Sequence, residues 1–212
     1  MSKLHRVGGE RRASFFYWAL LRYPSTLVGG IRLGLLAAAI GVHFSETSDE
    51  LRWWVVLLIG LNYLLDLLDG YLARRFGHTS RFGVALDFLI DQTTHTVFWL
   101  ISGLLAAIPL MVLEWCAGIV VLRYTLCADE HWKEVLLAKG GALVRAYFAH
   151  NQRNVLSALG VISHFALPAS SYLWLSGWSL WIWVPGVALY AWVTLLMLVM
   201  LYRAEIHSPA AS

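Results

Sequence analysis

Six long apolar segments restrict what this chain of 212 residues can fold into. They comprise residues 25–44, 53–73, 82–108, 109–127, 155–176 and 178–202. Each is long enough to cross the hydrocarbon core of a bilayer as a helix. In lipid such segments have to be helical, because no water is present to satisfy their backbone polar groups. The sequence therefore predicts an all-α integral membrane protein with six transmembrane helices.

The composition agrees with this prediction and leaves no room for a second, soluble domain. Charged residues make up 14% of the chain, against about 25% in soluble domains. We divide the chain into a basic juxtamembrane segment at 1–24, a six-helix domain at 25–204 and a short tail at 205–212. Four cations precede an aromatic run in the first segment: Lys3, Arg6, Arg11 and Arg12. We therefore expect that segment to form a basic interfacial helix.

The distribution of Lys and Arg predicts the orientation. With six spans, both termini and the loops at 74–81 and 128–153 lie on the same side of the membrane, and they hold nearly every Lys and Arg. The positive-inside rule places that side in the cytoplasm. We expect a multi-pass protein of a bacterial inner membrane or of the endoplasmic reticulum, surrounded by membrane lipids and without a nucleic-acid partner.

Four aspartates interrupt two neighbouring apolar segments. Asp66 and Asp69 are spaced i, i+3, and Asp87 and Asp91 are spaced i, i+4, so each pair shares one helix face. A carboxylate in hydrocarbon costs about 2.5–3.5 kcal/mol even on the lenient insertion scale. The turn between the two segments is short, so the helices are expected to be antiparallel neighbours. All four carboxylates then lie at one depth, just below the cytoplasmic surface.

These carboxylates predict a binding site for Mg²⁺ or Mn²⁺, because all-oxygen ligands select such hard cations. Four carboxylates can hold two ions in the arrangement used for phosphoryl transfer. Gly70 and Ala73 leave space against the helix backbone, and the guanidinium of Arg74 suits phosphate oxygens. The structural alternative is a set of ion pairs inside the membrane with Arg32, Arg74 or Arg123.

The segment from 66 to 91 resembles the CDP-alcohol phosphotransferase family. It matches every specified position of that family's signature, DxxDGxxAR followed after eight residues by GxxxDxxxD. The resemblance implies an enzyme of phospholipid biosynthesis that transfers a phosphatidyl group from CDP-diacylglycerol to the hydroxyl of a small alcohol and releases CMP. It also implies two Mg²⁺ or Mn²⁺ ions as cofactors and a homodimer.

The resemblance also assigns roles to individual residues. Asp66, Asp69 and Asp87 are implied to hold the first ion, and Asp66, Asp87 and Asp91 the second. Asp91 is in addition the implied general base, and therefore the catalytic residue. Eight residues are assigned to the CDP donor: Gly29, Gly30, Ile31, Arg32, Gly70, Ala73, Arg74 and Ser80.

For the acceptor we expect inositol or inositol phosphate. The stretch RFGVALD at 81–87 and the RAYF stretch at 145–148 resemble segments of phosphatidylinositol synthases. Those enzymes usually carry an arginine where this chain has Gln92, so a phosphatidylglycerophosphate synthase or another family member stays an alternative. Three arginines are assigned to the acceptor: Arg123, Arg145 and Arg153. Ordinary basic residues of a cytoplasmic loop are the alternative interpretation of these three.

Two further polar residues, His95 and Glu114, lie inside the apolar segments. His95 lies one helical turn beyond Asp91 and is either a substrate contact or a satisfied interior histidine. Glu114 needs a partner on another helix, because Arg123 is too far along the same one. A cation-coupled transporter is the alternative of a different class. Transporters tend to have internal repeats and broken helices, and the sequence has neither.

Overall fold

The structure is a computed structural model that describes residues 24–45, 48–76, 81–127, 131–175 and 177–206. These residues form helices with short connections, and no strand occurs among them. The predicted interfacial helix at 1–24 lies outside the described residues, apart from Pro24 at the start of the first helix. The predicted tail is described only as far as Ile206.

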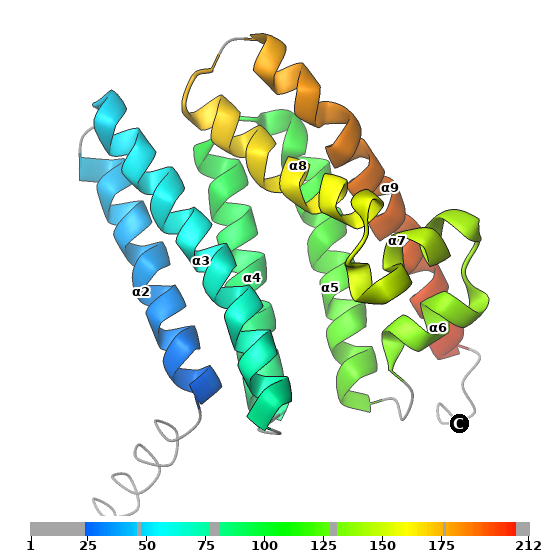
Figure 1. Ribbon diagram of the computed structural model, residues 1–212. Coiled ribbons are helices and arrows are strands. Elements are labelled where there is room, and N and C mark those ends of the chain that lie inside the picture. Colours follow the sequence, from blue (N-terminus) through cyan, green and yellow to red (C-terminus); the bar gives the residue numbers. More distant parts are fainter. Residues whose placement is uncertain (1–23, 46–47, 77–80, 128–130, 176, 207–212) are drawn as a thin grey trace, which may run out of the picture.

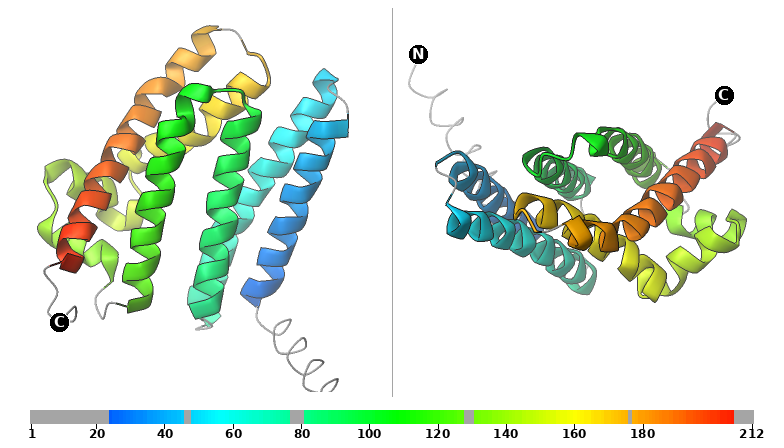
Figure 2. Two further views of the ribbon diagram at one scale, coloured as in Figure 1. Left: turned by 180° about the vertical axis from the view of Figure 1, so that it is seen from behind. Right: turned by 90° about the horizontal axis from the view of Figure 1, so that it is seen from above.

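Six long helices lie side by side in a bundle (Figures 1 and 2). They are α2 (Pro24–Ser45), α3 (Asp49–Phe76), α4 (Arg81–Ile101), α5 (Ile108–Cys127), α8 (Val155–Tyr172) and α9 (Gly177–Ile206). The helix α2 packs along α3, and both contact α4, which in turn contacts α5. Seen from above, α8 lies between the α2–α3 pair and α9 (Figure 2). The antiparallel arrangement expected for the two aspartate-bearing helices is present, since α3 and α4 contact each other and run in opposite directions (Figure 1).

Five of these helices are long and apolar enough to cross a membrane. Their candidate spans are Leu27–Ser45, Asp49–Leu68, Leu105–Cys127, Val155–Tyr172 and Leu180–Ala204. The protein is thus a multi-pass membrane protein. The sixth long helix, α4, is less apolar because it carries Asp87, Asp91, Gln92 and His95, and it is not among the candidate spans. The six-span layout therefore stays a prediction.

The connection between α4 and α5 differs from the prediction. Residues 82–108 were predicted to form one span, followed directly by the next span at 109, but α4 ends at Ile101 and a short 3₁₀ turn follows at Leu105–Ala107. Gly103 has φ +74°, a left-handed conformation that ends a helix readily only at glycine. The hydroxyl of Ser102 donates to the carbonyl of Trp99 at 2.7 Å, which stabilises this helix end.

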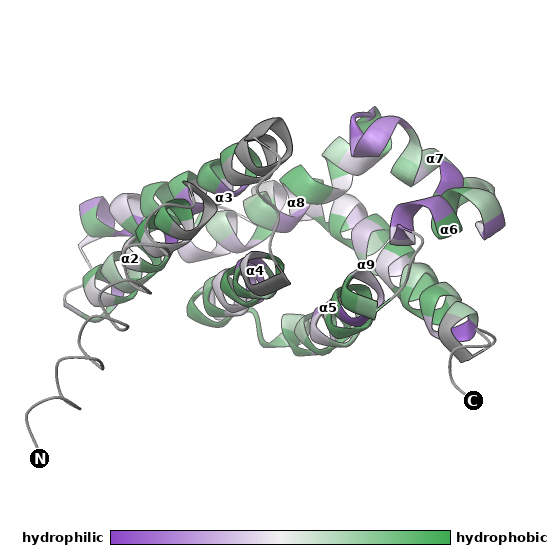
Figure 3. Cartoon of the chain, turned by 90° about the horizontal axis from the view of Figure 1, so that it is seen from below, coloured by the Kyte–Doolittle hydropathy of each residue, from purple (hydrophilic) through white to green (hydrophobic). Residues whose placement is uncertain are grey.

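The polar stretch at 128–153 was expected to be a loop, and this prediction was wrong. It contains α6 (Trp132–Lys139) and α7 (Ala142–Gln152), whose polar faces are visible in Figure 3. Their apolar side chains pack with α9 in a buried cluster that includes Val135, Leu136, Val144, Tyr147 and Phe148. Burial of apolar surface thus makes helices of a segment whose average composition is polar.

Tyr147 fixes how α7 meets α8. Its ring lies against Gly160, where an added Cβ would be 2.6 Å from the Tyr147 Oη. Glycine is therefore required at this contact. Burial raises the pKa of Tyr147 to about 12, so its hydroxyl is neutral at physiological pH.

The interior between α2, α3 and α4 is apolar toward one end of these helices and polar toward the other. A second cluster joins α2, α3, α4 and α8 near the end where α2 meets α3, and it contains Ala39, Val55, Ile59, Phe98, Ala169 and Tyr172. Toward the opposite ends of α3 and α4, the side chains facing α2 are Asn62, Asp66, Asp87 and Asp91 instead. The candidate site lies there.

Candidate active site

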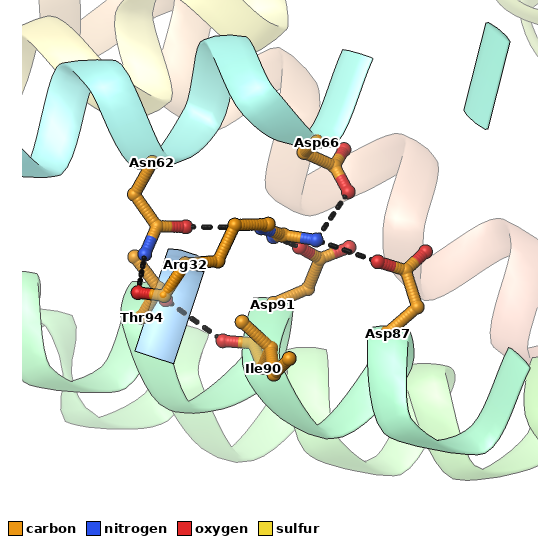
Figure 4. A network of polar contacts seen from close by, with 7 residues as sticks. All are labelled: Arg32, Asn62, Asp66, Asp87, Ile90, Asp91 and Thr94. Atoms are coloured by element: carbon orange, nitrogen blue, oxygen red, sulfur yellow. Dashed lines mark hydrogen bonds and ion pairs between the residues drawn. The ribbon is translucent and has the colours of Figure 1, made fainter. Parts of the chain in front are cut away.

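Three of the predicted aspartates converge on the guanidinium of Arg32 (Figure 4). Arg32 Nη1 donates to Asp66 Oδ1 at 2.8 Å and to Asp87 Oδ1 at 2.5 Å, and its Nη2 donates to Asp91 Oδ1. The arginine side chain is 1% exposed, whereas the three carboxylates are about one-third exposed. Helices α2, α3 and α4 therefore meet in a site whose acidic side remains accessible.

Asn62, which precedes Asp66 by one helical turn on α3, positions Arg32. The Arg32 Nε donates to Asn62 Oδ1 at 3.2 Å, and Asn62 Nδ2 donates to the Arg32 backbone carbonyl at 2.7 Å. This pair of hydrogen bonds joins α2 to α3 inside the bundle, where unpaired polar groups are costly. The sequence analysis did not select Asn62, although its i, i+4 spacing from Asp66 places both on one helix face.

The geometry fits a divalent cation. One carboxylate oxygen each from Asp66, Asp87 and Asp91 lies within 4.8 Å of the others, and a set of oxygen ligands suits Mg²⁺ or Mn²⁺. The predicted ion pairs with Arg32 are also present, so the structural alternative holds for that arginine. However, three carboxylates carry three negative charges against the single positive charge of Arg32. Charge compensation by a further cation is therefore favourable here.

Five predicted site residues fall wholly or partly outside the described part of the structure. Asp69, Gly70, Ala73 and Arg74 all belong to helix α3, but their side chains lie outside the described part. Their roles in the site stay predictions. Ser80 lies outside the described residues altogether.

Residues 29–32 of α2 were all assigned to the CDP donor, but they do not all face the aspartates. Gly29 packs on α4, where an added Cβ would be 3.4 Å from Ile90. Gly30 and Ile31 are exposed, and Ile31 is 48% accessible. Arg32 is thus the residue of this stretch that the structure brings to the aspartates, and the donor contacts of the other three stay predictions.

The three acceptor candidates lie on other parts of the chain than the helices that carry the aspartates. Arg123 is on α5, Arg145 is on α7, and Arg153 follows α7 directly; all three are exposed. The main contacts of α7 are with α6, α8 and α9. Before Arg153 the backbone is left-handed at three consecutive non-glycine residues, His150, Asn151 and Gln152, an uncommon conformation that costs energy.

A second polar cluster joins α4, α5 and α8. Glu114 Oε1 lies 2.6 Å from His164 Nε2 and 3.8 Å from His95 Nδ1. The prediction that Glu114 has its partner on another helix is confirmed. The sequence analysis did not select His164, because nothing in the spacing along the chain relates it to Glu114.

A sequence model of the CDP-alcohol phosphatidyltransferases matches residues 24–199. The chain belongs to the CDP-alcohol phosphatidyltransferase family. This family of membrane transferases acts in phospholipid biosynthesis, and it uses a CDP-alcohol, an alcohol acceptor and a divalent metal. Membership decides against the cation-coupled transporter. No curated protein and no solved structure gives a significant match to the chain.

Because Arg32 is ion-paired with Asp66, Asp87 and Asp91, replacing it tests whether these carboxylates bind a divalent cation. In Arg32→Leu, three carboxylates face one another without their buried cation, and breaking a buried ion pair costs about 3–5 kcal/mol. We expect the Tm of the variant to fall strongly in EDTA and to recover in large part when Mg²⁺ is added. Thermal unfolding of the purified protein in detergent measures both values. Arg203→Leu, at an exposed position on α9, is the control. An equal loss of Tm with and without Mg²⁺ would show that the carboxylates do not bind the cation.

Proposed function

We propose that this phosphatidyltransferase uses CDP-diacylglycerol as the donor and an inositol-type alcohol as the acceptor, and releases CMP. The observation that carries the proposal is the convergence of Asp66, Asp87 and Asp91 from two helices within a chain of this family. The inositol assignment rests on the RFGVALD and RAYF stretches at 81–87 and 145–148.

We assign two roles to the aspartates, which are metal binding and acceptance of the acceptor's proton. We assign Asp66, Asp69 and Asp87 to one divalent ion and Asp66, Asp87 and Asp91 to a second. Mg²⁺ or Mn²⁺, when bound, neutralises the charge of the pyrophosphate and of the departing CMP. The one-third exposure of the three described carboxylates supports this assignment, because a substrate-bound ion needs access.

Asp91 is assigned as the general base. The acceptor's hydroxyl oxygen attacks the phosphorus that carries the diacylglycerol, and a new P–O bond forms as the bond to the CMP oxygen breaks. The hydroxyl proton passes to the Asp91 carboxylate, and CMP leaves with the electron pair of the broken bond. A positioned base of this kind contributes about 10²–10⁴-fold to the rate.

The donor is assigned to the ends of α2 and α3. Arg32 already lies among the carboxylates, and a guanidinium binds phosphate oxygens through paired hydrogen bonds. Gly29, Gly30 and Ile31 precede it on α2. The remaining assigned donor contacts follow Asp66 along the chain: Gly70, Ala73, Arg74 and Ser80.

We further propose that α4 crosses the membrane as the sixth span, with the site and both termini in the cytoplasm. Its 21 residues extend about 31 Å at 1.5 Å per residue, which matches the hydrocarbon core. It also lies alongside α5 and the α2–α3 pair (Figure 1), each of which contains a candidate span. A homodimer, implied by the family resemblance, is part of the same proposal.

Arg145 and Arg153 are proposed to bind the acceptor's phosphate if the acceptor is phosphorylated. A hydrogen bond to a charged group is worth about 1.5–3 kcal/mol. We therefore expect Arg145→Ala and Arg153→Ala each to raise the KM for the phosphorylated acceptor roughly ten- to a hundredfold. The KM for CDP-diacylglycerol should not change, and steady-state CMP release measures both constants. If both KM values rose together, these arginines would be structural or donor-binding residues.

The choice of acceptor is tested by product identification. Purified protein is incubated with CDP-diacylglycerol, Mg²⁺ and, one at a time, inositol, inositol phosphate, glycerol 3-phosphate and serine. We expect mass spectrometry to detect the highest yield of phosphatidyl product with an inositol compound. A higher yield with glycerol 3-phosphate would support the phosphatidylglycerophosphate synthase alternative, and a higher yield with serine would contradict both assignments.

A further inference from the structure

The second polar cluster directly adjoins the aspartates. His95 follows Asp91 by one helical turn on the same face of α4. Its ring stacks on Tyr63 of α3, with ring centroids 5.1 Å apart and planes 8° from parallel. The side chain of Gln92 reaches α5 near Gly118, one turn from Glu114. We call Tyr63, Gln92, His95 and Glu114 the deep subsite.

Glu114 is held in place from its far side. The His164 Nε2 lies 2.6 Å from Glu114 Oε1, and the indole Nε1 of Trp99 donates to the same His164 nitrogen at 3.0 Å. The side chains of Glu114 and His164 are only 2–3% exposed. The carboxylate is therefore buried and oriented by α8, with His95 on its other side.

Three members of the deep subsite have a buried polar atom without a hydrogen bond in the part of the chain that the structure describes. These atoms are Tyr63 Oη, Gln92 Oε1 and His95 Nδ1, and the last of them lies 3.8 Å from Glu114 Oε1. Buried polar groups are nearly always hydrogen-bonded, and each one left unsatisfied is destabilising. Three such atoms on α3 and α4, beside the Glu114 carboxylate of α5, point to a bound group that supplies hydrogen bonds.

Exposure indicates from which side that group enters. The carboxylates of Asp66, Asp87 and Asp91 are about one-third exposed, His95 is 20% exposed, and Glu114 is 2% exposed. Accessibility thus decreases from the aspartates to Glu114. This gradient indicates that a group bound beside Glu114 would enter from the side of the aspartates, past His95.

We propose that the deep subsite binds the non-reacting hydroxyl groups of the acceptor alcohol, so that the reacting hydroxyl is held at Asp91. This inference rests on the proposed function. A hydroxyl both donates and accepts hydrogen bonds, which suits an acceptor-only carboxylate oxygen beside a histidine nitrogen. A phosphate does not suit this end, because its charge would add to those of Glu114 and the aspartates. The subsite therefore selects an uncharged polyol end, with any phosphate directed outward.

A metal ion is the other candidate occupant, since ligand atoms of His95, Glu114 and His164 lie within 4.8 Å of one another. The hydrogen bonds disfavour it. The Nε2 of His164 already lies 3.0 Å from the indole Nε1 of Trp99 and 2.6 Å from Glu114 Oε1, so its immediate surroundings are occupied by protein atoms. The short contact between Glu114 and His164 is also closer than two ligands around one ion would be.

The test compares two variants of the deep subsite with a matched control. Glu114→Gln removes the charge, and His95→Gln removes the ring nitrogen from the opposite side. Ser163→Ala is the control, because Ser163 is equally buried and also lacks a hydrogen bond, but it faces Gly186 of α9. We measure the KM for inositol and for CDP-diacylglycerol by CMP release, the affinity for inositol by calorimetry with Mg²⁺ and CMP, and bound metal by elemental analysis.

We expect both subsite variants to raise the KM and the Kd for inositol about ten- to a hundredfold, with the KM for CDP-diacylglycerol and the control unchanged. Three results would overturn the subsite: an unchanged inositol KM, a parallel rise of both KM values with a loss of Tm, or a tightly bound transition metal that both variants lose. The proposed function fails separately, if the wild-type protein releases no CMP with any alcohol.

Discussion

Asp91→Asn is expected to lower kcat about 10²–10⁴-fold, the range typical for the loss of a general base. Asparagine keeps the size and position of the side chain but cannot take the acceptor's proton. Binding of CDP-diacylglycerol should survive, because Asp66, Asp69 and Asp87 still hold one ion. Single-turnover CMP release measures the chemical step, and labelled CDP-diacylglycerol measures donor binding.

The control for this change is Asp49→Asn, an exposed acid in the first turn of α3 at its other end. It should leave kcat unaltered. Wild-type turnover by Asp91→Asn would show that another group takes the proton, and loss of donor binding together with kcat would assign Asp91 to metal binding alone.

Removal of divalent metal is expected to abolish turnover. Without a cation, the pyrophosphate of the donor and the carboxylates of Asp66, Asp87 and Asp91 repel each other, and Arg32 supplies only one positive charge against them. Activity should disappear in EDTA and return when Mg²⁺ or Mn²⁺ is added in excess. Circular dichroism in EDTA checks that the helices persist, so that lost activity is not lost fold. Undiminished turnover in EDTA would exclude the two-metal mechanism.

Much of the fold could be predicted from the sequence, because membrane helices are specified by local composition. Apolar length alone locates α2, α3, α5, α8 and α9 to within a few residues. The helix end at Ser102–Gly103 was missed, since the segment stays apolar on both sides, although a Ser-Gly pair is a local turn signal. The helices α6 and α7 were missed because their polar average hid apolar residues at helical spacing.

The candidate site could be predicted in part, because its aspartates are recognisable from local composition and spacing. Carboxylates inside apolar segments are conspicuous, and their i, i+3 and i, i+4 spacing gives a common face, so Asp66, Asp87 and Asp91 were expected to meet. The partners of Arg32 and Glu114 depend instead on how distant helices pack. Asn62 lies 30 residues from Arg32, and His164 lies 50 residues after Glu114, so no spacing rule relates them.

The central claim is that the aspartate site transfers a phosphatidyl group from a CDP-linked donor to an alcohol. Release of CMP from CDP-diacylglycerol by the purified protein in nanodiscs tests it most directly, with the acceptor present or omitted and with Asp66→Asn and Asp87→Asn beside the wild type. We expect the wild type to form CMP and phospholipid in equal amounts, dependent on acceptor and Mg²⁺, and each variant to lose both products. Equal CMP release by the wild type and both variants, or CMP release without a phospholipid product, would contradict it.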